Sequence, residues 1–147
     1  TARADRIDVT QEGAAVIYDY KTGTPPNQKQ VAELYAPQLP LEAAIVEHGG
    51  FTDLGQLPVR DLVYIQASGR QDGGEQQRAT KDGPEGLSTK ALEDLQGLVA
   101  HFANTDTPYE VKRRAGTAFA SAYRHDDYEH LARVQEWLTQ ETEEDWG

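Results

Sequence analysis

The chain has 147 residues, of which 37% are apolar and 27% are charged, and its net charge is −11 at pH 7. This length favours one domain with a buried core, and no apolar run approaches the ~20 residues of a membrane span. The acidic balance argues against a protein that coats nucleic acid through a basic surface. A DNA enzyme stays open, because a metal centre can bind phosphate locally.

The predicted elements alternate between strands and helices, with glycine and proline in most of the connections. In chain order we expect strands over 3–9 and 14–21, a loop over 22–28, a helix from about 37 to 47, a strand over 59–67, a loop or poor hairpin over 69–86, a helix from 89 to about 103, an irregular stretch over 105–125 and a helix from about 127 to 139. This order predicts an α/β fold with a mixed sheet flanked by helices.

Two of the helices have recognisable starts. Pro37 fits a helix start, because the first N–H groups of a helix have no intrahelical partner, and Gly49-Gly50 ends that helix. Ser88 is expected to cap the next helix. The apolar stripe of that helix consists of Leu92, Leu95, Val99 and Phe102.

The first two strands predict a register that brings charged side chains together. If Gln11-Glu12-Gly13 forms the loop, Thr10 faces Ala14, and continuing the pairing places Asp5 opposite Asp19. Directly opposed residues share a face of the sheet. Lys21, two residues beyond Asp19, lies on the same face.

Two opposed carboxylates repel each other, so we expect a compensating charge. Lys21 supplies one, and a divalent cation held by Asp5, Asp19 and the Tyr20 carbonyl would supply more; oxygen ligands suit Mg²⁺ or Mn²⁺. Such a site would activate water and stabilise a phosphate, with Lys21 orienting the water. The alternative is a surface ion pair between Lys21 and Asp19. We interpret Arg6 and Asp8 as structural.

Three motifs, ARADRID, YDYKTGTPP and APQLPLEAAI, occur in this order over residues 2–45. Together they resemble the RecB-type nucleases of the PD-(D/E)XK superfamily. Within it they are most similar to the C-terminal nuclease domains of the AddB family, which work with an AddA-like subunit in helicase–nuclease complexes of bacterial double-strand break repair.

The resemblance implies a restriction-endonuclease-like core and a magnesium-dependent or manganese-dependent DNA exonuclease. It implies that Asp5, Asp19, Lys21 and Gln38 are the catalytic positions. Gln38 is also spaced to share a buried stripe with Leu41 and Ile45, from which its amide could bond to water or phosphate; without the resemblance, a capping amide is the simpler interpretation.

The sequence departs from the family pattern at three points. Ala2 replaces the first-motif glycine, and Glu42 stands where a tyrosine usually follows the glutamine. The upstream helix of many relatives is absent, and since the chain starts at Thr1 we expect that residues 1–147 are a fragment of the nuclease domain. With no cysteine, this chain can ligate no iron–sulfur cluster, and the lack of cysteine fits the cytoplasmic location that we expect.

Contacts to DNA are predicted for Tyr35 and for the basic run Lys112, Arg113 and Arg114, which could instead be a solvated loop. His101, His125 and His130 have no metal-ligand spacing. The alternative function is a nuclease-like fold that only binds DNA or docks a subunit. The opposed carboxylates favour the enzyme, and their repulsion predicts that Asp19→Ala stabilises the metal-free fold.

Overall fold

The computed structural model describes residues 2–67 and 74–108, which belong, as far as Thr107, to one compact unit, Thr1–Thr107. The helix predicted over 127–139 and most of the stretch predicted to be irregular lie outside the described residues. Within the described ranges, no helix has both the length and the apolar character needed to cross a lipid bilayer.

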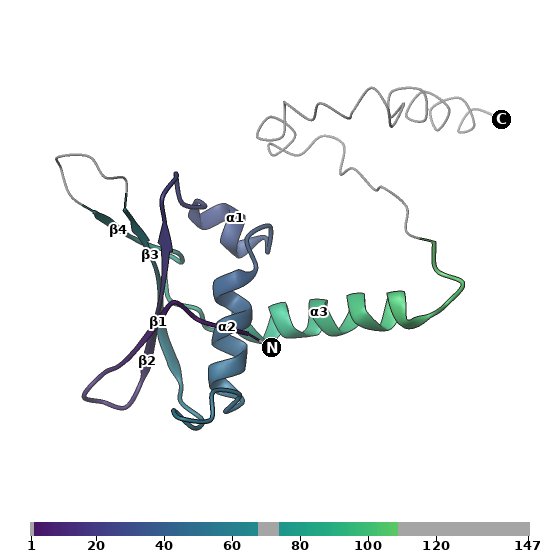
Figure 1. Cartoon of the computed structure of the whole chain (residues 1–147), viewed down its shortest axis with the longest axis horizontal. Coiled ribbons are helices and arrows are strands. Elements are labelled where there is room, and N and C mark those ends of the chain that lie inside the picture. Colours follow the sequence, from purple (N-terminus) through teal and green to yellow (C-terminus); the bar gives the residue numbers. More distant parts are fainter. Residues whose placement is uncertain (1, 68–73, 109–147) are drawn as a thin grey trace. The chain divides into compact units, whose positions relative to one another are not determined.

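A four-stranded mixed sheet organises the described residues (Figure 1). Along the sheet, the antiparallel pair β1 (Arg6–Val9) and β2 (Ala15–Lys21) is followed by β3 (Val59–Gln66), parallel to β2, and by β4 (Glu75–Arg78), antiparallel to β3. Parallel neighbours need a crossover connection, which contains α1 (Gln28–Ala32) and α2 (Gln38–Glu47). The α/β fold with a mixed sheet and an N-terminal antiparallel hairpin is therefore confirmed.

The hairpin has the predicted register. Arg6 pairs with Tyr18 and Asp8 with Val16, while the Thr10 N–H donates to the Ala14 carbonyl at 2.8 Å. Gly13 closes the turn at φ +80°, a backbone conformation that costs glycine little. Asp5 immediately precedes β1, so it lies where the ladder would continue toward the end of β2.

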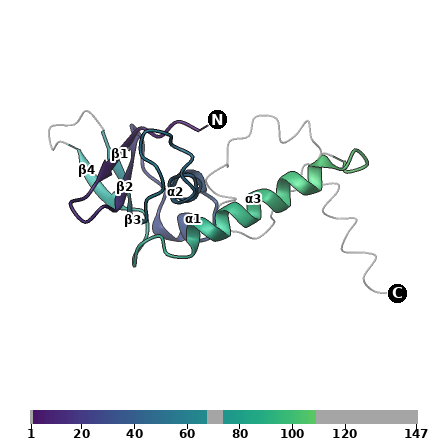
Figure 2. The same cartoon turned by 90° about the horizontal axis from the view of Figure 1, so that it is seen from below.

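α2 lies on one side of the sheet (Figure 2), and buried residues of both form the core. Alternation along β2 and β3 sends every second side chain to this face, where the side chains of α2 meet them. The fully buried residues of this layer are Ala15 and Ile17 of β2, Leu62 and Tyr64 of β3, and Leu39, Ala43 and Val46 of α2. The sheet and α2 therefore pack against each other as two layers, with these residues between them.

The predicted boundaries of α2 are confirmed, but the following segments differ from the prediction. The stretch expected to be a loop or poor hairpin contains β4, and α3 (Leu87–Ala103) starts after Gly86 rather than with Ser88 as its cap. Ser88 is buried, and its hydroxyl donates to Glu47 Oε2 at 2.6 Å.

The apolar stripe of α3 is half-buried at Leu92 and exposed at its other three positions. Only the start of α3 packs beside α2, and the rest extends away from the sheet (Figure 1). Leu95 is 40% exposed, Val99 61% and Phe102 36%.

Candidate active site

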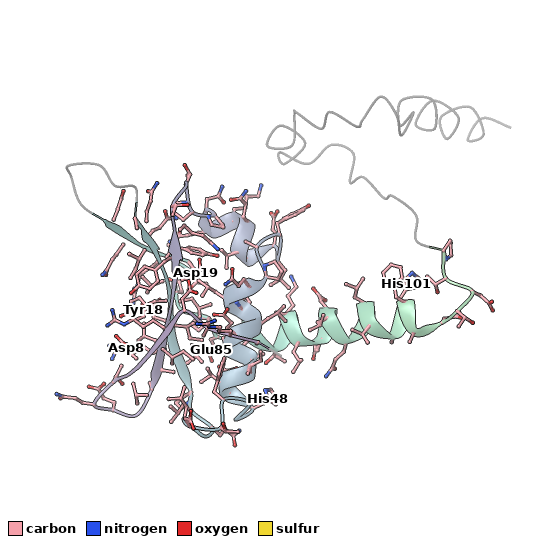
Figure 3. The ribbon with its side chains drawn as sticks, in the orientation of Figure 1. Asp8, Tyr18, Asp19, His48, Glu85 and His101 are labelled. Atoms are coloured by element: carbon pink, nitrogen blue, oxygen red, sulfur yellow. The ribbon has the colours of Figure 1, made fainter. Side chains whose placement is uncertain are left out.

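Asp19 lies near the end of β2 on the face of the sheet that α2 covers. It follows Ala15 and Ile17 at every second position, so the strand alternation turns all three toward the core, and Asp19 is only 2% exposed. Figure 3 shows Asp19 on this side, with Tyr18 and Asp8 on the other. A buried carboxylate needs a charged or hydrogen-bonding partner.

Asp19 finds its partners in a closed ring with Lys21 and Gln38. The Lys21 ammonium lies 2.8 Å from Asp19 Oδ2 as an ion pair, and this oxygen has no hydrogen-bond partner among the described residues. Gln38 Nε2 donates to Asp19 Oδ1 at 2.8 Å, and Gln38 Oε1 accepts from Lys21 Nζ at 3.2 Å. The strand end and the first residue of α2 are thereby joined at one polar cluster.

The Gln38 amide is oriented by charges on both of its ends. Nε2 also donates to Glu42 Oε1 at 3.2 Å, one helical turn along α2. Reversing the amide would turn its oxygen toward two carboxylates and its NH₂ toward an ammonium. Contrary to the predicted buried stripe, Gln38 is exposed and Leu41 and Ile45 are only half-buried; the deeply buried positions of α2 belong to the face that contacts the sheet.

Glu42 is a member of the site that the sequence analysis recorded only as a departure from a family pattern. It is 5% exposed, and its Oε2 has no hydrogen-bond partner among the described residues. Burial raises the pKa of the Glu42 carboxyl, and the charges of Asp19 and Asp5 raise it further, against the opposing effects of the Gln38 bond and of Lys21. Its spacing of four residues from Gln38 was the available signal.

Tyr64 is a second residue that the sequence analysis did not identify. It is the partner of Asp19 in the parallel β2–β3 register and is 1% exposed. Burial raises the pKa of its hydroxyl to about 12, with the charges of Asp19 and Glu42 contributing. The register of a parallel pair joined by a long crossover leaves no local mark in the sequence.

Asp5 reaches the same end of the sheet from the N-terminal segment. Its Oδ2 accepts a hydrogen bond from the Tyr20 N–H at 3.0 Å, next to Asp19 in the chain, and Asp5 itself is exposed. The charges of Asp5 and Asp19 both raise the pKa of Glu42, so each of the two lies within electrostatic reach of Glu42.

The chemistry of these groups fits a hard divalent cation. The donors are oxygens, of the kind that Mg²⁺ and Mn²⁺ prefer, and Glu42 Oε2 is a buried oxygen without a partner. The described residues bring no three His, Cys, Asp or Glu side chains close enough to hold a metal directly. A cation here would therefore use few carboxylates and keep several waters, as Mg²⁺ commonly does.

Other predicted site residues lie apart from this cluster or outside the described residues. Arg6 and Asp8 form an exposed ion pair at 2.5 Å, with the guanidinium 4.9 Å from the centre of the Tyr18 ring, which agrees with a structural role. Tyr35 is half-buried between α1 and α2, and His101 is exposed on α3. Outside the described residues lie Lys112, Arg113, Arg114, His125 and His130.

Comparison with known proteins identifies one family over nearly the whole chain. The profile of the PD-(D/E)XK nuclease superfamily matches residues 1–144. Uncharacterized proteins of Rickettsia are similar over shorter stretches: one of Rickettsia conorii is 39% identical over 54 residues, or 37% of this chain, and one of Rickettsia typhi is 42% identical over 48 residues, or 33% of this chain. The chain spans about 6% of the length of these relatives. No solved structure matches the chain significantly.

Proposed function

Because the chain belongs to the PD-(D/E)XK nuclease superfamily, we propose that it is the catalytic domain of a metal-dependent nuclease that hydrolyses phosphodiester bonds in DNA. The observation that carries this proposal is the ring of Asp19, Lys21 and Gln38, which gathers an acid, an amine and an amide at one strand end. A surface ion pair would explain Lys21 beside Asp19, but not the burial of Asp19 or the oriented Gln38 amide.

The roles of the residues follow from their chemistry. Asp5, Asp19 and the Tyr20 carbonyl are the groups that would hold Mg²⁺ or Mn²⁺. Such a cation, when bound, lowers the pKa of water and offsets the charge of a phosphate. Lys21, about one-third exposed, can donate to the attacking water or to a phosphate oxygen. Gln38 is an exposed residue, and its amide can contact the same groups.

The biological setting belongs to the same proposal. We take the domain to be an exonuclease of a cytoplasmic helicase–nuclease complex in double-strand break repair, paired with an AddA-like subunit. The support is the resemblance of three motifs in their order along the chain to AddB nuclease domains. Tyr35 and the basic run at 112–114 remain predicted DNA contacts.

The test is a nuclease assay of the complete protein with its partner subunit in the presence of Mg²⁺. Asp19→Ala should reduce cleavage by about 10²-fold or more, the scale of losing one electrostatic stabiliser of a transition state. Asp8→Ala, which removes an exposed carboxylate from the opposite face, should leave cleavage unchanged. Full cleavage by Asp19→Ala would reject the proposed site, and DNA binding without cleavage by the wild type would favour a binding or docking module.

A further inference from the structure

Glu42 poses a physical problem that the ring of Asp19, Lys21 and Gln38 does not resolve. Its side chain is 5% exposed, yet among the described residues it makes a single hydrogen bond, which Oε1 accepts from Gln38. A buried oxygen without a partner costs free energy, and such atoms commonly mark a missing water or ion.

Glu42 and Asp19 converge on one group. The same NH₂ of Gln38 donates to Asp19 Oδ1 at 2.8 Å and to Glu42 Oε1 at 3.2 Å. The two carboxylate oxygens are therefore at most 6.0 Å apart, the sum of these two distances. The partly positive NH₂ group of Gln38 thus contacts two acids at once. A cation, which carries a full charge, would be attracted to the same pair of acids more strongly than this NH₂ group.

We propose that Glu42 is a third acidic group of the cation site, and that it accepts a hydrogen bond from a water molecule coordinated to the cation held by Asp5 and Asp19. This inference rests on the function proposed above. The contact runs through water because the described residues form no three-carboxylate cluster at ligand distance. Gln38 is the exposed member of this cluster, so its side chain is the one that a phosphate can reach.

The experiment measures binding of Mn²⁺ to the full chain by isothermal titration. Glu42→Gln keeps the size of the side chain and an oxygen for the Gln38 bond but removes the charge. We expect its Kd for Mn²⁺ to rise about 10-fold to 100-fold, as for other groups that orient a metal site from outside the ligand set. Asp19→Asn should abolish binding, and Glu93→Gln, an exposed change on α3, should leave the Kd unchanged.

A second measurement uses the wild type and so does not depend on the folding of a variant. In ¹³C-labelled protein titrated with Mg²⁺, the Glu42 side-chain carboxyl resonance should move and saturate together with that of Asp19. Wild-type affinity in Glu42→Gln, or a Glu42 resonance that stays still while that of Asp19 moves, would overturn the role of Glu42 and leave the proposed function standing. Wild-type affinity in Asp19→Asn would overturn both.

Discussion

At the scale of single residues, the charge of Asp19 is balanced from within the protein. The Lys21 ammonium and the Gln38 amide each contact one of its oxygens at 2.8 Å, while Asp5 is held by the Tyr20 N–H instead. The expectation that removing Asp19 relieves repulsion assumed that Asp5 was its main neighbour. Because of these contacts, we now expect the removal of Asp19 to destabilise the metal-free protein rather than to stabilise it.

We therefore predict that Asp19→Ala lowers the free energy of unfolding of the metal-free protein by about 1–3 kcal/mol, because it removes the ion pair with Lys21 and the hydrogen bond that the Asp19 carboxylate accepts from Gln38. Asp8→Ala, which breaks only an exposed ion pair, should cost about 0–1 kcal/mol. Mg²⁺ at 100 times its Kd should stabilise the wild type by about 2.7 kcal/mol and leave Asp19→Ala unchanged. Urea denaturation with and without Mg²⁺ measures all three; stabilisation of Asp19→Ala by Mg²⁺ would contradict the site.

Glu42 predicts a specific dependence of stability on pH. Its pKa is raised in the folded protein by burial and by Asp19 and Asp5, so the folded state holds the proton more tightly than the unfolded state. The resulting stabilisation is complete below the unfolded pKa of about 4.3 and is lost as pH rises through the folded value.

Glu42→Gln has no such proton to lose. Its stability relative to the wild type should therefore increase from pH 4 to pH 8 in metal-free buffer, and Glu93→Gln on exposed α3 should show no such trend. Denaturation at several pH values gives the difference, and a difference that stays constant with pH would refute the assignment.

At the scale of elements, α2 places Gln38 and Glu42 because both of its ends are defined locally. Pro37 precedes the first turn, and Gly49 follows the last with φ +71°, a conformation that glycine adopts with little cost. The start of α2 sets where Gln38 points, so the ends of this helix contribute to the geometry of the site.

Two glycine substitutions test whether the left-handed backbone conformation of Gly49 matters, because Gly97 lies in the interior of a helix instead. Gly49→Ala should destabilise the protein by about 1–2 kcal/mol, because alanine is strained in the left-handed region. Gly97→Ala, within α3 and with open space around its added methyl group, should raise helix stability by about 0.5–1 kcal/mol. Circular dichroism during thermal unfolding measures both, and effects of the same sign would show that backbone conformation is not the cause.

Elements with local signals were predictable, and those without were not. The loop at Gln11–Gly13 sets the hairpin register, and proline and glycine mark the ends of α2. β4 is short and polar and depends on pairing with β3, and Ser88 resembled a cap although it bonds to Glu47 instead. The stripe on α3 has helical spacing, but spacing does not specify what would cover it.

At the scale of the whole molecule, the site is assembled from segments far apart in the chain. The N-terminal segment contributes Asp5, β2 contributes Asp19 and Lys21, and α2 contributes Gln38 and Glu42. The hairpin register brings Asp5, Asp19 and Lys21 together, so these three residues were predictable from the sequence. The place of Glu42 depends on how the crossover lays α2 across the sheet, which needs the fold.

The most direct test of the central claim is the position of Mn²⁺ in crystals of this chain, located by its anomalous scattering. We predict a single strong peak bonded to the Asp5 and Asp19 carboxylates, with Glu42 linked to it through water. Mn²⁺ bound only at a histidine such as His101, with both aspartates lacking metal at saturating concentration, would contradict the account.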